Sequence, residues 1–239
     1  MIVYGRNVLR EALRAGYPIH EIRLSPEAEV DLADLLSKRL NKTVVLKRVN
    51  ARELDSWTEG AAHQGIAARI KDFEEYALED VLKSPPENGP IVFLDQAQDP
   101  RNFGAIARTA LAAGAKGLVM PKRRSAPISA VALKAAAGAF FQLKAAYETN
   151  LARALDKVKG AGYWIYGTDA KAEKDIYQID FTPQVALVLG GEGEGMRQLV
   201  RSKCDFIFRI PMTENVESLN VSVAAGIVLY EIFRRRNKG

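Results

Sequence analysis

The chain has 239 residues, of which 48% are hydrophobic and 26% are charged, and its formal net charge is +5. This is the balance of a soluble globular protein with one large or two modest domains. A single cysteine, Cys204, excludes an intrachain disulfide, and two histidines are too few for a typical zinc site of Cys and His ligands. We therefore expect no metal.

Location and partners are constrained in the same way. No segment approaches the roughly 20 uninterrupted apolar residues of a membrane span, and the charged N-terminus MIVYGRNVLREAL lacks the apolar region of a signal peptide. These features predict a cytoplasmic protein that does not enter a membrane. The positive charge favours a polyanionic partner, because basic side chains that neutralise phosphates release counterions, although many basic proteins bind no nucleic acid.

The first 72 residues are predicted to form a small α/β domain. Residues 5–16 place their apolar side chains on one helical face. Further along we expect strands at 20–25, 43–49 and 65–70, an amphipathic helix at 30–40 and a short helix at 51–57. The polar stretch that follows, residues 73–89, ends among prolines and glycines and is predicted to be a linker.

Residues 90–239 are predicted to form a second domain in which apolar strands alternate with helices. We expect strands at 91–95, 117–120, 142–147, 163–169, 185–190 and 206–211, and helices at 103–115, 129–140, 150–162, 196–204 and 219–236. Such alternation is typical of a parallel α/β sheet covered on both faces. Because ligands bind beyond the carboxyl ends of such strands, the informative loops follow Leu94, Tyr166, Leu189 and Ile210.

Polar residues near the starts of two predicted helices are candidates for capping or for chemistry. Asp99 begins a turn, and Asn102 could cap the helix that follows it. Arg108 lies inside that helix among small and apolar residues. It is either a surface residue or a residue whose planar guanidinium binds a phosphate or carboxylate. Either Ser218 or Asn220 could cap the last helix.

The segment GGEGEGM, residues 190–196, directly follows the strand that ends at Leu189. It is not the dinucleotide fingerprint G-x-G-x-x-G, since Met196 occupies the last glycine position, and it lacks the Gly-Lys-Ser/Thr of a P-loop. Glu192 and Glu194 argue against an anionic ligand and suit a cationic ligand or a ribose hydroxyl. A flexible turn into a helix is the alternative interpretation.

Three long motifs of the second domain resemble those of a known family. LDQAQDPRNFGAIARTALAAGA, LVLGGEGEGM and IPMTENVESLNVSVAAGIVLYE are similar, in order and spacing, to the motifs of SpoU/TrmH-type RNA 2′-O-ribose methyltransferases of the SPOUT superfamily. VYGRNVLREAL and HQGIAAR resemble the N-terminal substrate-binding domain of the bacterial 23S rRNA guanosine 2′-O-methyltransferase subgroup. The resemblance covers nearly the whole chain.

The resemblance implies a fold, a cofactor and an assembly. The fold would be a parallel-sheet SPOUT domain with a deep trefoil knot, preceded by an RNA-binding α/β domain, and the enzyme would be a homodimer. It would use S-adenosylmethionine to methylate a ribose 2′-hydroxyl, with a 23S rRNA guanosine as the expected target. The expected cofactor residues are Thr168, Leu189, Gly191, Gly195, Ile210, Met212 and Leu219, with the glycines letting main-chain groups close around the adenosine.

The resemblance also implies a catalytic set, namely Arg108, Asn102, Glu192, Ser218 and Asn220. Arginine stays protonated in proteins. We therefore expect Arg108 to grip the phosphate beside the target ribose and to stabilise negative charge on the oxygen. Asn102 and Asn220 would orient the substrate and Arg108. Glu192 would bind a hydroxyl or Arg108, and Ser218 would support the loop.

RNA binding is assigned to basic residues outside the three long motifs of the second domain. Arg6, Arg10 and Arg14 could form one side of the first helix, and Lys122, Arg123 and Arg124 follow a strand end where phosphates could be held. Solvation alone would also explain both sets.

Three alternatives compete with this interpretation. An ordinary Rossmann oxidoreductase would carry an early G-x-G-x-x-G, which this sequence lacks. A noncatalytic RNA-binding protein of the same fold would be expected to lose Arg108, Asn102 or the glycine loop, and all are present. A tRNA ribose is the alternative substrate within the enzyme class.

Overall fold

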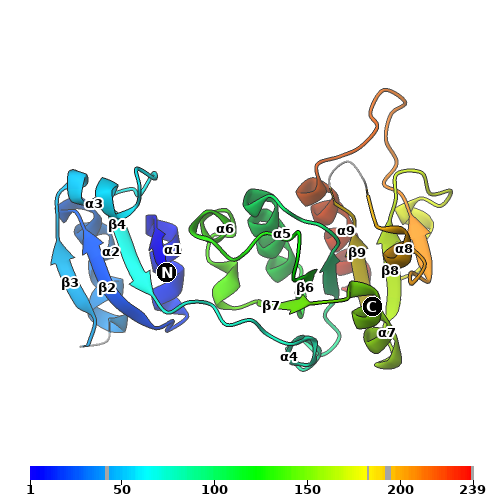
Figure 1. Ribbon diagram of the computed structural model, residues 1–239, viewed down its shortest axis with the longest axis horizontal. Coiled ribbons are helices and arrows are strands. Elements are labelled where there is room, and N and C mark those ends of the chain that lie inside the picture. Colours follow the sequence, from blue (N-terminus) through cyan, green and yellow to red (C-terminus); the bar gives the residue numbers. More distant parts are fainter. Residues whose placement is uncertain (41–42, 182, 192–194, 238–239) are drawn as a thin grey trace.

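The computed structural model describes residues 1–40, 43–181, 183–191 and 195–237, which form two sheets flanked by helices (Figure 1). The first sheet runs in the order β1-β4-β2-β3, and β2 pairs in parallel with β3 and antiparallel with β4. Its elements are β1 (Ile2–Tyr4), α1 (Arg6–Arg14), β2 (Ile19–Leu24), α2 (Pro26–Arg39), β3 (Val45–Arg48), α3 (Ala51–Trp57) and β4 (Ile66–Ile70).

The second sheet has six strands in the order β10-β8-β9-β5-β6-β7, and each strand is parallel to its neighbours. Its strands are β5 (Ile91–Leu94), β6 (Gly117–Pro121), β7 (Lys144–Glu148), β8 (Trp164–Thr168), β9 (Val185–Leu189) and β10 (Phe206–Phe208). Its helices are α5 (Pro100–Ala112), α6 (Ala130–Ala135), α7 (Leu151–Gly160), α8 (Gln198–Arg201) and α9 (Val221–Arg236), with short 3-10 turns η1 (Ala139–Phe141) and η2 (Ile176–Gln178).

The predicted α/β fold with a parallel sheet is confirmed, and the sequence pattern explains it. Every residue of β5, β6 and β9 is buried, because helices cover both faces of the sheet. The helix predicted over residues 5–16 buries the expected apolar face, namely Val8, Leu9, Ala12 and Leu13.

Several segments differ from the prediction. The strand β1 was not expected, and α8 spans Gln198–Arg201 within the range 196–204 that was expected to be helical. The helix expected at 129–140 stops at Ala135, because Ala137 and Gly138 adopt φ angles of 47° and 87° and the chain then continues as η1. The stretch expected as a linker contains α4 (Leu78–Leu82), whose Leu78 and Val81 are fully buried against the second sheet. None of the described helices has both the length and the apolarity needed to cross a membrane.

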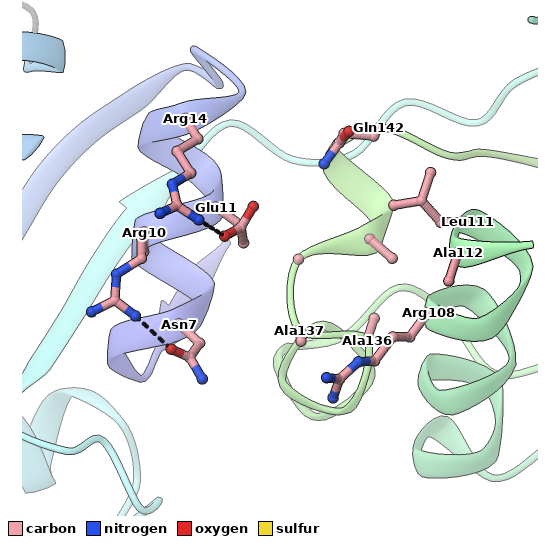
Figure 2. Close-up of a pocket in the computed structure, with 12 residues that line it drawn as sticks. Asn7, Arg10, Glu11, Arg14, Arg108, Leu111, Ala112, Ala136, Ala137 and Gln142 are labelled. Atoms are coloured by element: carbon pink, nitrogen blue, oxygen red, sulfur yellow. Dashed lines mark hydrogen bonds and ion pairs between the residues drawn. The ribbon is translucent and has the colours of Figure 1, made fainter. Parts of the chain in front are cut away.

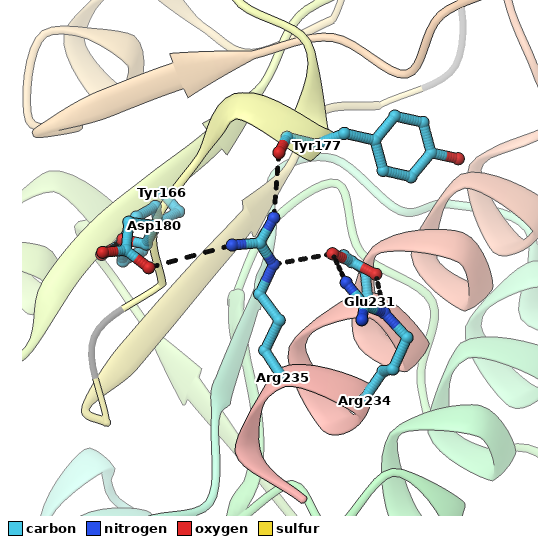
Figure 3. A network of polar contacts seen from close by, with 6 residues as sticks. All are labelled: Tyr166, Tyr177, Asp180, Glu231, Arg234 and Arg235. Atoms are coloured by element: carbon cyan, nitrogen blue, oxygen red, sulfur yellow. Dashed lines mark hydrogen bonds and ion pairs between the residues drawn. The ribbon is translucent and has the colours of Figure 1, made fainter. Parts of the chain in front are cut away.

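A network of polar contacts fixes the C-terminal end of α9 (Figure 3). Glu231 is only 7% exposed and accepts hydrogen bonds from Nε of Arg234 and Nε of Arg235, each at 2.7 Å. Arg235 also donates to the carbonyl oxygen of Tyr177 at 2.9 Å, which ties α9 to the connection between β8 and β9. The hydrogen bonds from Arg234 and then Arg235 lower the pKa of Glu231 to about 2.

Replacing Glu231 with glutamine should lower the free energy of unfolding at pH 7 by about 1–3 kcal/mol, because the arginines lose a charged acceptor. The pKa of Glu231 lies below the ordinary glutamate value of about 4.3. Its stabilising effect is therefore present above that value and is lost as the pH falls toward about 2. Urea unfolding at pH 7 and pH 3 measures the free energy of unfolding of both proteins. The difference between the two values should be smaller at pH 3 than at pH 7.

The matched control is Glu173→Gln, which changes an exposed carboxylate between β8 and η2. It should alter stability by less than about 0.5 kcal/mol. If Glu231→Gln lowers the free energy of unfolding equally at both pH values, the role given to the ionised carboxylate is contradicted.

Candidate active site

The carboxyl ends of four neighbouring strands meet at one edge of the second sheet. Leu94 of β5 is in register with Leu189 of β9, and Thr168 of β8 is in register with Phe208 of β10. β8 and β9 are themselves neighbours. The loops after β5, β8, β9 and β10 therefore converge, as expected for the ligand-binding edge of a parallel sheet.

An ion pair between a buried carboxylate and a partly exposed arginine joins two of these loops. Asp95, directly after β5, has a fully buried side chain and accepts hydrogen bonds from the Arg197 backbone N at 2.8 Å and its Nε at 2.7 Å. The backbone N of Asp95 also donates to the carbonyl oxygen of Leu189 at 2.8 Å. The sequence motifs do not indicate this pair, although an acid placed immediately after an apolar strand is a usable signal.

Main-chain hydrogen bonds join the two described ends of the glycine loop. The amide N of Gly191 donates to the oxygen of Gly195 at 3.1 Å, and the amide N of Gly195 donates back at 3.2 Å. A Cβ on Gly190 would lie 2.5 Å from the backbone N of Met196, and Gly195 adopts a φ of 70°. Glycine is thus required by the loop's own closure. Glu192 lies outside the described residues, as does Glu194.

The predicted cofactor residues lie at the ends of β8 and β9, in the glycine loop, and in the connection from β10 to α9. Thr168 is half-buried at the end of β8, and its Oγ1 donates to the carbonyl oxygen of Val188 at 3.5 Å. Leu189 is 1% exposed, so its side chain belongs to the core. The three apolar candidates beyond β10 and before α9 are half-buried: Ile210, Met212 and Leu219.

Two asparagines from distant motifs are brought together. The Nδ2 of Asn220 donates to the Oδ1 of Asn102 at 3.0 Å. The Oδ1 of Asn220 also accepts from the backbone N of Ser222 at 2.9 Å, so Asn220, and not Ser218, caps α9. The prediction that Asn102 caps α5 is wrong, because Asp99 does so. Asn102 is therefore available for the contact with α9.

Arg108 lies on the exposed side of α5 and reaches into a cleft between α5, the turn after α6, and α1 (Figure 2). Across the described ranges, no hydrogen bond or ion pair joins it to Asn102, Asn220 or any carboxylate. Ser218 is exposed in the loop before α9. The structure thus groups Asn102 with Asn220 and leaves the guanidinium of Arg108 facing the open cleft.

The basic candidates for RNA contact lie in three different surroundings. Lys122, Arg123 and Arg124 are exposed in the loop after β6, with the Lys122 Nζ 3.6 Å from a Glu75 carboxylate oxygen. Arg6 donates through Nε to the carbonyl oxygen of Gln64 at 3.0 Å and so holds α1 to the loop before β4. Arg10 instead lines the cleft that contains Arg108.

The described part of the chain offers neither a cluster of metal ligands nor a reactive cysteine. It contains no cluster of three or more His, Cys, Asp or Glu side chains that would hold a metal ion. Burial raises the pKa of the Cys204 thiol to about 12, so this cysteine is protonated at neutral pH and is a poor nucleophile.

Comparison with known proteins identifies the family. Residues 89–230 match the SpoU rRNA Methylase family, and residues 2–76 match the RNA 2′-O ribose methyltransferase substrate-binding domain. The chain is 38% identical to the TrmH family tRNA/rRNA methyltransferase YacO of Bacillus subtilis over 98% of this chain and 96% of that protein. It is 40% identical to the 23S rRNA (guanosine-2′-O-)-methyltransferase RlmB of Pseudomonas putida, with the same coverage of both.

A solved structure agrees with these relatives. The SpoU methyltransferase AviRb of Streptomyces viridochromogenes, in complex with the cofactor AdoMet, superposes with a TM-score of 0.84 at 26% identity, covering 100% of this chain and 91% of that one. The sequence motifs, the parallel sheet and the matches to both family models lead to one conclusion. The chain belongs to the SpoU/TrmH family and is an S-adenosylmethionine-dependent RNA 2′-O-ribose methyltransferase.

Proposed function

We propose that this enzyme methylates the 2′-hydroxyl of a guanosine in 23S rRNA. The observation that carries the proposal is the end-to-end likeness to the Pseudomonas putida enzyme named for that reaction, which includes the N-terminal substrate-binding region. A tRNA ribose is the second candidate, because the Bacillus subtilis relative is named for tRNA or rRNA.

The strand-end edge of the second sheet fits S-adenosylmethionine, the methyl donor of the family. When bound, this cofactor supplies a methyl group on a positively charged sulfur that leaves readily. We assign the main chain of Gly191 and Gly195, with Thr168 and Leu189, to the adenosine. The half-buried side chains of the neighbouring loops, Ile210, Met212 and Leu219, would cover the faces of the adenine. The buried charge of Asp95 is matched by Arg197, so the edge carries no buried unpaired charge from that residue.

The protein's task is to align the ribose 2′-oxygen with the methyl carbon and to stabilise the charge that develops as the oxygen loses its proton. We assign the phosphate beside the ribose, and this developing charge, to Arg108, whose guanidinium faces the open cleft. Asn102 and Asn220 fix each other's amides at 3.0 Å and would orient the nucleotide. Glu192 would bind a hydroxyl or Arg108, and Ser218 would support its loop.

We also propose that the enzyme is a homodimer with a trefoil knot in its second domain. One face of α9 supports the dimer, since Val223 and Tyr230 are 51% and 52% exposed and lie at the spacing of a single helical stripe with Ile227 between them. The domains would be residues 1–72 for RNA and 90–239 for catalysis, joined by 73–89. An enzyme that modifies rRNA would act in the cytoplasm.

In the decisive experiment, the purified enzyme is incubated with labelled S-adenosylmethionine and one unmethylated RNA. One incubation contains 23S rRNA and the other contains tRNA, and both RNAs lack ribose methylation. We expect label in 23S rRNA at one guanosine, found as an alkali-resistant dinucleotide. Label confined to tRNA would replace the proposed substrate with the second candidate. Label in neither RNA would overturn the proposed function.

A further inference from the structure

The N-terminal domain is docked on the catalytic domain of its own chain, at the turn after α6. A Cβ on Gly138 would lie 2.7 Å from the Cγ of Glu11 on α1, so only glycine allows this approach. Lys134 of α6 donates through Nζ to the carbonyl oxygen of Ala62 at 2.8 Å and lies 5.5 Å from the ring of Tyr4.

An aromatic cluster closes one end of the same junction. Tyr17 follows α1, Phe73 follows the first sheet, and Phe141 belongs to η1 of the second domain. The Tyr17 ring centroid lies 5.0 Å from that of Phe73 and 5.0 Å from that of Phe141. Because aromatic pairs at these distances attract each other, they help to hold the two domains together.

This docking creates an open cleft of about 540 Å³ that both domains line (Figure 2). α1 contributes Arg10 and Arg14, and α5 contributes Arg108. The wall between them consists of small residues, Ala136 to Ala139, which leave space for a chain to approach the protein backbone. The volume falls in the range of sites that hold small molecules or single units of a polymer.

The charge of the cleft selects for an anion. Three arginines and one carboxylate, that of Glu11, line the cleft. The Arg10 Nη1 donates to the Oδ1 of Asn7 at 2.7 Å, and the Arg14 Nη1 donates to the Oε1 of Glu11 at 2.8 Å. These contacts orient the two guanidinium groups, and each group keeps most of its five N–H donors for a ligand.

We infer that this cleft holds the RNA backbone next to the modified nucleotide, with Arg10 and Arg14 binding phosphates in line with the one bound by Arg108 of the same chain. The inference rests on the proposed function and adds to it. Arg10 and Arg14 are then substrate-positioning residues. The N-terminal domain of each chain holds the RNA against the Arg108 of that same chain. Arg6, which is tied to Gln64, is not part of this site.

The first test uses the full-length double variant Arg10→Ala/Arg14→Ala. We expect the KM for RNA to rise at least tenfold, while the Kd for S-adenosylmethionine changes less than twofold. The slope of log affinity for RNA against log salt concentration should fall by about 1.4, since each phosphate contact to a single strand contributes about 0.7. The matched control is Arg39→Ala/Arg52→Ala, which removes two exposed arginines of the same domain outside the cleft.

A KM and a salt slope equal to those of the control variant would overturn the inference. That result is distinct from failure of the proposed function, in which the unaltered enzyme itself methylates neither RNA.

A second test asks whether Arg10 and Arg14 act with the Arg108 of their own chain or with that of the partner chain in a dimer. Mixed dimers of an Arg108→Ala chain and an Arg10→Ala/Arg14→Ala chain are purified through two different tags. If the cleft works within one chain, neither site is complete, and at limiting RNA the activity should not exceed that of the Arg10→Ala/Arg14→Ala homodimer. Activity near half that of the unaltered enzyme would show that the arginines of one chain serve the other, against the inference.

Discussion

Replacing Arg108 with alanine is expected to reduce the rate of methyl transfer by about 10²–10³-fold, the range seen when a preorganised charge-stabilising donor is removed. Its guanidinium faces the cleft without a protein partner among the described residues, so the loss should fall on the substrate and not on the fold. Binding of S-adenosylmethionine, measured by calorimetry, should change less than twofold.

Two further variants make the result specific. Arg108→Lys keeps the positive charge but loses the planar fork, so it should restore only part of the rate. Arg153→Ala removes an exposed arginine of α7, and its rate should stay within twofold of the unaltered enzyme. Full activity of Arg108→Ala would remove Arg108 from the mechanism.

The elements of the fold were largely predictable because their periodicity is local. Strands that are buried on both faces appear as continuous apolar runs, as in Val185–Leu189, and the first helix shows its buried face in the spacing of its leucines and valine. The errors arose where tertiary contact overrides local preference. The alanine-rich stretch after Ala135 favours helix, yet the chain turns at Gly138 so that α1 can pack there.

The motifs named candidate site residues, but they did not indicate which of those residues touch. The motifs indicated both Asn102 and Asn220, but nothing in a spacing of 118 residues predicts that their amides meet. Likewise, the partner of Asp95 lies 102 residues away, and it appears only when β5 and β9 become neighbours. The position of Arg108 beside Arg10 and Arg14 depends on how two domains dock, which no local pattern encodes.

Replacing Gly190 with alanine is expected to weaken binding of S-adenosylmethionine by more than tenfold. The added Cβ would lie 2.5 Å from the backbone N of Met196, and backbone cannot rotate aside as a flexible side chain can. The turn closed between Gly191 and Gly195 would therefore have to open, and with it the main-chain groups that we assign to the adenosine. Isothermal titration with the cofactor measures the effect directly.

The matched control is Gly160→Ala at the end of α7, where an added Cβ meets nothing within 4 Å. It should leave the Kd for the cofactor within twofold, because it makes the same chemical change without a steric conflict. Thermal unfolding of both variants separates a distorted loop from a destabilised sheet: we expect Gly190→Ala to melt within a few degrees of the unaltered enzyme, since the altered loop lies beyond the end of β9. A Gly190→Ala enzyme that binds the cofactor with unchanged affinity would show that this turn does not form the cofactor site. That conclusion would hold whether or not the Arg108 variants lose activity.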